Sequence, residues 1–339
     1  MQLYVNVTDE RLSKGNNRIF SKSFFQNEIL KSFDHNALLN SKLPAPKKLS
    51  EAERERINEV VKNALILLQR ETDPVSYIDK NSIRLYEIER GISVAIYGMV
   101  PERQLPMESY VGYTLFKNGF PAAYGGGWVF VKRSLFGINV FEWFRGGESG
   151  YILCQLLRVY KQAFGVSCFE VEPYQYGKGN PEGIKSGAFW FYYRYGFRPV
   201  NEQLRIIAQK ESELISATKG YRTSAETLKK FTASNIVLNF SQGVPVSMAE
   251  IRENVTSMIA RDFGGNRNAA VKFCVAEFKK SAKSKLKFNA DEQKVLEDVA
   301  LIAKARGLNK NSEIKILLEL VKLKPVDLYA YQLKLSKIV

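Results

Sequence analysis

The sequence predicts an α/β (α+β) protein in which helices flank a mixed sheet and a helical region follows it. From residue 83 to residue 144, apolar residues tend to recur with the period of two that is typical of strands. Residues 140–200 then read as strand, glycine-rich turn, amphipathic helix, strand and aromatic helix. After Pro199 the apolar spacing is helical. We therefore expect a mainly helical N-terminal region at 1–75, a mixed domain at 76–200 and an all-helical C-terminal domain at 201–339.

The composition excludes several classes of protein. Apolar residues make up 45% and charged residues 25% of the 339 residues, which is ordinary for a globular protein. No apolar run approaches the ~20 residues that span a bilayer, and the first residues lack the apolar stretch of a signal peptide. The three cysteines are odd in number and widely spaced, as is typical of thiols in a reducing compartment. We expect a cytoplasmic protein without a membrane partner.

The single histidine and the net charge narrow the chemistry further. With only His35 present, a histidine-based triad and a histidine-rich zinc site are excluded, and we expect no metal. His35 stands where a loop leads into a short predicted helix, and a polar surface role is its simplest interpretation. The net charge of +15 makes nucleic acid a possible partner. The densest basic run, at 279–287, is more simply interpreted as a solvated helix end, so we do not favour that partner.

The elements before residue 145 are predicted from local signals. Ser50 and Glu53 have the spacing of a capping box, and the helix that they open should run to about residue 71. Asn118 and Gly119 favour a hairpin turn because both tolerate a positive φ. The three glycines at 125–127 indicate a bulge or the close approach of another backbone. The predicted strands form an antiparallel meander and lie at 91–99, 110–116, 122–130 and 137–144.

The helices after residue 200 are predicted from their caps. Capping boxes begin at Thr223 and Ser247. Further N-caps are expected at Asn266, Asn289 and Ser312.

Two motifs within residues 140–200 resemble a known family. Residues 188–197 read AFWFYYRYGF and look like the A-x-x-L-Y-x-K/R-x-G-F ending of the GNAT superfamily of N-acyltransferases. Residues 145–150 read RGGESG and resemble the Q/R-x-x-G-x-G/A turn of that family. The resemblance covers residues from about 83 to 200. It implies a GNAT-like sheet, acetyl-CoA or another acyl-CoA as cosubstrate, and an amine as acceptor.

The resemblance also implies that the backbone amides of the turn hold the CoA pyrophosphate. Amides at the start of the helix after Gly150 attract an anion, by about 0.3–1 kcal/mol through the helix dipole. Two registers of the motif remain open. One places Phe144 where the family has glutamine or arginine; the other starts at Arg145 and places Glu148 on the first glycine. The residues expected at the cofactor are Val140, Phe144, Arg145, Gly146, Gly147, Ser149 and Gly150.

The expected chemistry requires a base for the amine and an acid for the leaving thiolate. The resemblance places the family's tyrosine on Tyr192, whose ordinary pKa of about 10 suits protonation of a thiolate. The alternative is that Tyr192 packs as one more aromatic side chain of its helix. Glu142, Glu170 and Glu172 lie on the two strands expected to flank the active-site opening, and any of them is a candidate base if burial raises its pKa. An exposed position on a strand is the alternative for each.

Two main functions remain open at this point. The first is an acyl-CoA-dependent N-acyltransferase that acts by direct attack of a small-molecule or peptide amine on the thioester. The second is a catalytically inactive GNAT-like module for binding or interaction, favoured by the imperfect turn and by Lys185 where the family has an asparagine. A nucleic-acid-binding role of the basic C-terminal helices is a weaker third. The sequence leaves the acyl chain length and the oligomeric state open.

Overall fold

A computed structural model describes residues 15–25, 27–30, 32–70, 73–282 and 287–337 of the chain. The strands are β1 (Arg84–Glu87), β2 (Ile92–Gly98), β3 (Ser109–Lys117), β4 (Phe120–Phe130), β5 (Arg133–Val140), β6 (Cys168–Val171), β7 (Arg198–Pro199) and β8 (Ile236–Asn239). The helices of the N-terminal and mixed regions are α1 (His35–Asn40), α2 (Glu51–Leu67), α3 (Asp73–Ser76), α4 (Ser149–Phe164), α5 (Pro181–Ser186) and α6 (Ala188–Arg194). The later helices are α7 (Glu202–Ala217), α8 (Ala225–Phe231), α9 (Met248–Phe263), α10 (Arg267–Ser281), α11 (Ala290–Arg306), α12 (Asn311–Leu323) and α13 (Leu328–Leu335).

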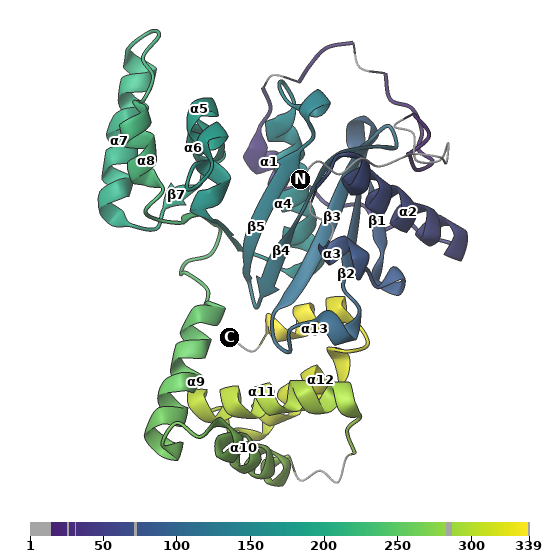
Figure 1. Cartoon of the computed structure of the whole chain (residues 1–339), viewed down its shortest axis with the longest axis vertical. Helices are drawn as coiled ribbons and strands as arrows, with labels where there is room; N and C mark the ends of the chain where they lie inside the picture. The colour runs from purple at the N-terminus through teal and green to yellow at the C-terminus, as the bar shows by residue number, and fades with distance from the viewer. Residues whose placement is uncertain (1–14, 26, 31, 71–72, 283–286, 338–339) are drawn as a thin grey trace.

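The eight strands form one mixed sheet in the order β1-β2-β3-β4-β5-β6-β8-β7. Strands β1 to β5 pair antiparallel, so the predicted meander is confirmed. Its β3–β4 turn uses Asn118 and Gly119 with φ of 50° and 82°, as the two residues predict. Helix α4 then carries the chain to β6, which pairs parallel with β5. The expected mixed sheet with flanking helices is therefore present (Figure 1).

The prediction that the chain after Pro199 is only helical is wrong. Strand β8 lies within that region and pairs antiparallel with both β6 and β7. It is inserted between them, so the sheet is completed by residues that the sequence assigns to another domain. Strand β8 has only three successive apolar residues, Ile236 to Leu238, and periodicity cannot distinguish so short a run from a helix segment.

Several element boundaries also differ from the prediction. Helix α2 has the expected capping box at Ser50 but ends at Leu67. The box at Ser247 and the N-caps at Asn266 and Asn289 are confirmed. Helix α8 is capped by Ser224 rather than Thr223, and the N-cap of α12 is Lys310 rather than Ser312.

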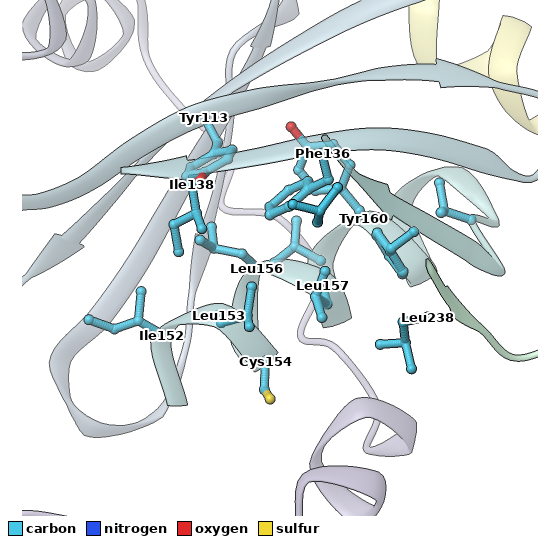
Figure 2. Packing of buried hydrophobic residues seen from close by; sticks show 14 of the residues in the cluster. Tyr113, Phe136, Ile138, Ile152, Leu153, Cys154, Leu156, Leu157, Tyr160 and Leu238 are labelled. Carbon is cyan, nitrogen blue, oxygen red and sulfur yellow. The ribbon is translucent and has the colours of Figure 1, made fainter. Parts of the chain in front are cut away.

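Helices cover both faces of the sheet. On one face, α4 packs its apolar side against the middle strands, where Phe136 stacks on Tyr113 with ring centroids 5.6 Å apart and meets Tyr160 edge-on at 5.1 Å. Figure 2 shows Leu156, Leu157 and Tyr160 of α4 directed at these strands. On the other face, α2 and α3 pack on Tyr97 and Phe141.

The last five helices form a bundle with its own core. The bundle lies at one end of the sheet, below it in Figure 1. Helix α13 belongs to both parts, because its Tyr329 stacks on Phe164 of α4 at 5.3 Å while its Tyr331 lies in the bundle core. No helix among the described residues is long and apolar enough to cross a membrane.

Candidate functional site

The candidate site lies where strands β5 and β6 separate. Their parallel pairing covers only Arg133–Leu135 of β5 against Cys168–Glu170 of β6, whereas β5 continues to Val140 and β6 ends at Val171. The carboxyl half of β5 is therefore not paired with β6, which leaves a gap in the sheet beyond Glu170. In open α/β sheets, ligands bind in the crevice outside the carboxyl ends of such strands.

A pocket of about 370 Å³ opens beside this gap, on the face of the sheet that α2 and α3 cover. Its volume is in the range of small-molecule sites. Its aromatic walls are Tyr97, Tyr110, Tyr124 and Trp128, and its polar groups include Asn139, Glu172 and Gln175.

Glycines give the pocket its floor. A side chain added at Gly126 of the lining, or at the neighbouring Gly112, would collide with a tyrosine, and one at Gly137 would make a tight contact with an amide. The Tyr97 ring covers Gly112 and the Tyr110 hydroxyl covers Gly126, while the Gln175 amide lies 3.3 Å from the place of a Cβ on Gly137. The expected close approach at 125–127 is thus made by tyrosine side chains as well as by a neighbouring strand. The register shift between β3 and β4 falls at Leu115/Phe116, so these glycines form no bulge in that pairing.

Tyr192 lies at the other side of the gap. It is buried, and its hydroxyl donates to Oε1 of Gln175 at 3.4 Å. Burial raises its pKa well above the ordinary value, so the hydroxyl keeps its proton at neutral pH. Gln175 therefore connects Tyr192 on one side to the pocket floor on the other.

The three expected carboxylates do not share two strands. Glu142 lies in a short 3₁₀ helix, η5 (Glu142–Phe144), because β5 ends at Val140. Glu172 follows β6 as the N-cap of another, η6 (Pro173–Tyr176). Only Glu170 lies on a strand, and the expectation for the other two is wrong.

The three carboxylates differ in their surroundings. Glu170 bonds Arg133 at 2.7 Å and accepts from the Asn235 amide at 2.6 Å, so it ties β6 to its neighbours. Glu142 is exposed at the start of η5. Glu172 alone lines the pocket. It is therefore the carboxylate best placed to meet a ligand.

The turn expected to hold a pyrophosphate leads from β5 into α4. Val140 ends β5, and its carbonyl accepts from Nε of Arg145 at 3.0 Å. Phe144 is half-buried beside a second, apolar pocket next to α2. Ser149 begins α4, and its hydroxyl donates to the Gly146 carbonyl at 3.0 Å. The turn is thus where the sequence places it, at the N-terminus of a long helix.

As it stands, this turn does not fit a pyrophosphate. Ile29 lies against Gly147 where a side chain would otherwise stand, and the Tyr195 hydroxyl occupies the same position at Gly150. Phe33 stacks on Tyr195 at 6.1 Å and meets Tyr151 edge-on at 5.3 Å. The space that Gly147 and Gly150 leave is therefore filled by the chain itself, whereas no atom lies within 4 Å of the place of a Cβ on Gly146.

Glu148 is a second obstacle to an anion at this turn. Its carboxylate accepts from the Leu30 amide at 3.2 Å and from Arg90 at 2.6 Å, and Lys117 lies 3.2 Å away. Burial disfavours the ionised form, but the bond from Arg90, the Leu30 amide and the charge of Lys117 outweigh it and lower the pKa of Glu148. Two cations near the turn are therefore already paired with a carboxylate.

Sequence reasoning missed the residues that converge from separate elements. Tyr110, Trp128 and Gln175 lie on β3, β4 and η6, and nothing in their local sequence indicates a shared pocket. The glycine run at 125–127 is the one local feature that indicates a pocket, because three glycines in a strand leave space beside the sheet that larger residues at these positions would fill. Ile29 gave no signal at all.

Comparisons with known proteins add no assignment. No family model matches the chain, and searches among curated proteins and among solved structures gave no match.

Proposed function

We propose that the chain is a GNAT-like N-acyltransferase that takes its amine acceptor in the aromatic pocket. The observation that carries this proposal is the gap between β5 and β6, which the pocket meets on one face and Tyr192 on the other, with Gln175 between them. Transfer requires an acceptor and a donor to meet at one point, and Gln175 brings the pocket within one hydrogen bond of Tyr192 here.

The side chains at the gap have suitable chemistry. Glu172 stands at the pocket, where its exposed carboxylate can accept a hydrogen bond from an amine. Tyr192 keeps its proton and can donate a hydrogen bond to negative charge that develops on the reacting thioester. In the structure, Gln175 accepts that hydrogen bond. A ligand atom in the gap would compete with Gln175 for that hydrogen.

The donor side requires movement. Acetyl-CoA or another acyl-CoA would bind at the turn only after Ile29 and Tyr195 leave Gly147 and Gly150. Ile29 is 54% exposed, so its displacement gives up little buried apolar surface.

A second candidate is a GNAT-like module that binds a ligand without transfer. The filled turn favours it, because a protein that never holds CoA has no need to keep those glycines free. A nucleic-acid role has less support. In the bundle, Arg267, Lys304 and Lys322 pair with Asp298, Glu277 and Glu292 on neighbouring helices at 2.8–3.0 Å. These basic residues therefore help to join helices.

A thermal-unfolding titration with CoA and with acetyl-CoA separates the first two candidates. Ligand at about one hundred times its dissociation constant should stabilise the fold by about 2.7 kcal/mol. We expect Ile29→Ala to bind more tightly than the wild type, because it vacates Gly147. Ile206→Ala on α7 is the matched control, since Ile206 is 52% exposed and lies on a distant helix. Absence of a shift at millimolar ligand in both the wild type and Ile29→Ala would exclude the cofactor and leave the binding module.

A further inference from the structure

The pocket beside β5 and β6 has an unusual charge for this protein. The chain carries a net charge of +15, yet no lysine or arginine is among the described residues that line the pocket. Glu172 is the one charged side chain of that lining, and the other polar groups are tyrosine hydroxyls and the amides of Asn139 and Gln175. The pocket is therefore electronegative within a basic molecule, which disfavours an anionic ligand and favours a cation.

The aromatic walls favour the same sign of charge. The faces of tyrosine and tryptophan rings attract cations through the ring quadrupole, and tryptophan does so most strongly. Tyr110 and Trp128 stand at a corner of the pocket, with ring centroids 5.3 Å apart and planes inclined by 66°. Trp128 and Tyr124 share one face of β4 with Gly126 between them, and Tyr97 completes the set from β2. Rings at different inclinations around one space are the arrangement that encloses an alkylammonium group.

The size of the pocket limits the ligand. About 370 Å³ accommodates a substituted ammonium group with a short alkyl chain, and Leu135 and Val75 supply apolar surface for that chain. The carboxylate of Glu172, which is exposed, lies where it can approach the cation from the solvent side.

From these observations we infer that the pocket is selective for an alkylammonium cation, enclosed by Tyr97, Tyr110, Tyr124 and Trp128 and paired with Glu172. This inference rests on the proposed function in taking the pocket as the acceptor site, and it narrows the acceptor from amines in general to positively charged alkylamines. A neutral arylamine and an anionic amino compound are excluded as preferred ligands.

Choline and its neutral isostere 3,3-dimethyl-1-butanol test this inference without transfer. Isothermal titration of the full chain at pH 7, in the absence of any acyl donor, measures both. Choline should bind at least about tenfold more tightly than the isostere, because the two differ mainly in charge. Equal affinity, tighter binding of the isostere, or no binding of either compound would overturn the inference.

Variants locate the site. Trp128→Leu should weaken choline binding by about tenfold and Glu172→Gln by about threefold, whereas Trp143→Leu, an exposed tryptophan outside the pocket, should leave it unchanged. Choline binding that survives Trp128→Leu in a folded protein would contradict the assignment. If Trp128→Leu fails to fold, the wild-type preference for choline over 3,3-dimethyl-1-butanol still tests the inference.

The inference and the proposed function can fail separately. If choline binds as expected but butylamine gives no product with acetyl-CoA, the ligand class stands and transfer is excluded. If acetyl transfer occurs to a neutral arylamine in preference to butylamine, transfer stands and the ligand class is excluded.

Discussion

Lys324 shows how strongly a single residue can couple the two parts of the molecule. It ends α12, is 2% exposed, and donates to the carbonyl of Glu108 at 2.8 Å and to the hydroxyl of Ser109 at 2.6 Å. Gln332 of α13 donates to the same hydroxyl. These bonds satisfy a cation buried between bundle and sheet, but they do not replace its hydration.

The change of protein stability with pH should reveal the lowered pKa of Lys324. Burial lowers the pKa of Lys324 to about 7, with the Glu108 carboxylate acting in the opposite direction. Between pH 7 and the ordinary value of 10.5, the unfolded chain binds the proton and the folded chain does not. The free energy of unfolding should therefore rise with pH across this window, by at most about 1.4 kcal/mol per pH unit for this group.

Chemical denaturation at a series of pH values measures this rise. Lys324→Met should remove it and raise stability at pH 7, whereas Lys315→Met, at an exposed position of the same helix, should keep it. A rise that persists in Lys324→Met would show that other groups cause it.

At the scale of elements, the start of α4 is shaped by a contact with α6 and the segment after it. Gly150 has no room for a side chain because the Tyr195 hydroxyl lies there, and Gly147 is covered by Ile29. The glycines that resemble a phosphate-binding turn thus also serve internal packing. Both uses require the same absence of a side chain, so the sequence motif alone cannot distinguish them.

Gly150→Ala tests the packing directly. The added methyl group should cost about 1–3 kcal/mol of stability through overpacking against Tyr195. Tyr195→Phe removes the hydroxyl that collides, so the double variant should recover part of the loss. Urea denaturation of the wild type, the two single variants and the double variant gives the coupling free energy between Gly150 and Tyr195. Gly243→Ala is the control, because no atom lies within 4 Å of the place of a Cβ on Gly243. Strictly additive effects would show that the two residues do not touch.

The sequence predicts correctly those caps and turns that depend on residues close together in the chain. The capping boxes at Ser50 and Ser247 and the turn at Asn118 depend on residues within a few positions, and all three are confirmed. Strand β8 was missed because only its partners β6 and β7 define it as a strand. The end of β5 was misplaced because Trp143 and Phe144 continue an apolar run that the chain folds into η5.

At the scale of the whole molecule, the site could be predicted only where one segment contains it. Tyr192 and Glu172 came from the aromatic ending and the strand before it. The pocket instead joins residues from α2 to η6, and the cover over the turn joins Ile29 to Gly147. Residues far apart in the chain come together here because of the order of the strands in the sheet, and a single sequence does not reveal that order.

The most direct test of the central claim is amine-dependent release of free CoA thiol from acetyl-CoA, with mass spectrometry of the amide. The proposed function predicts that the wild type, or Ile29→Ala if the covered turn limits entry, converts butylamine to N-butylacetamide. Tyr192→Phe should slow this conversion at least about tenfold while amine binding stays within about twofold. Absence of amide with both proteins at millimolar acetyl-CoA would contradict the account.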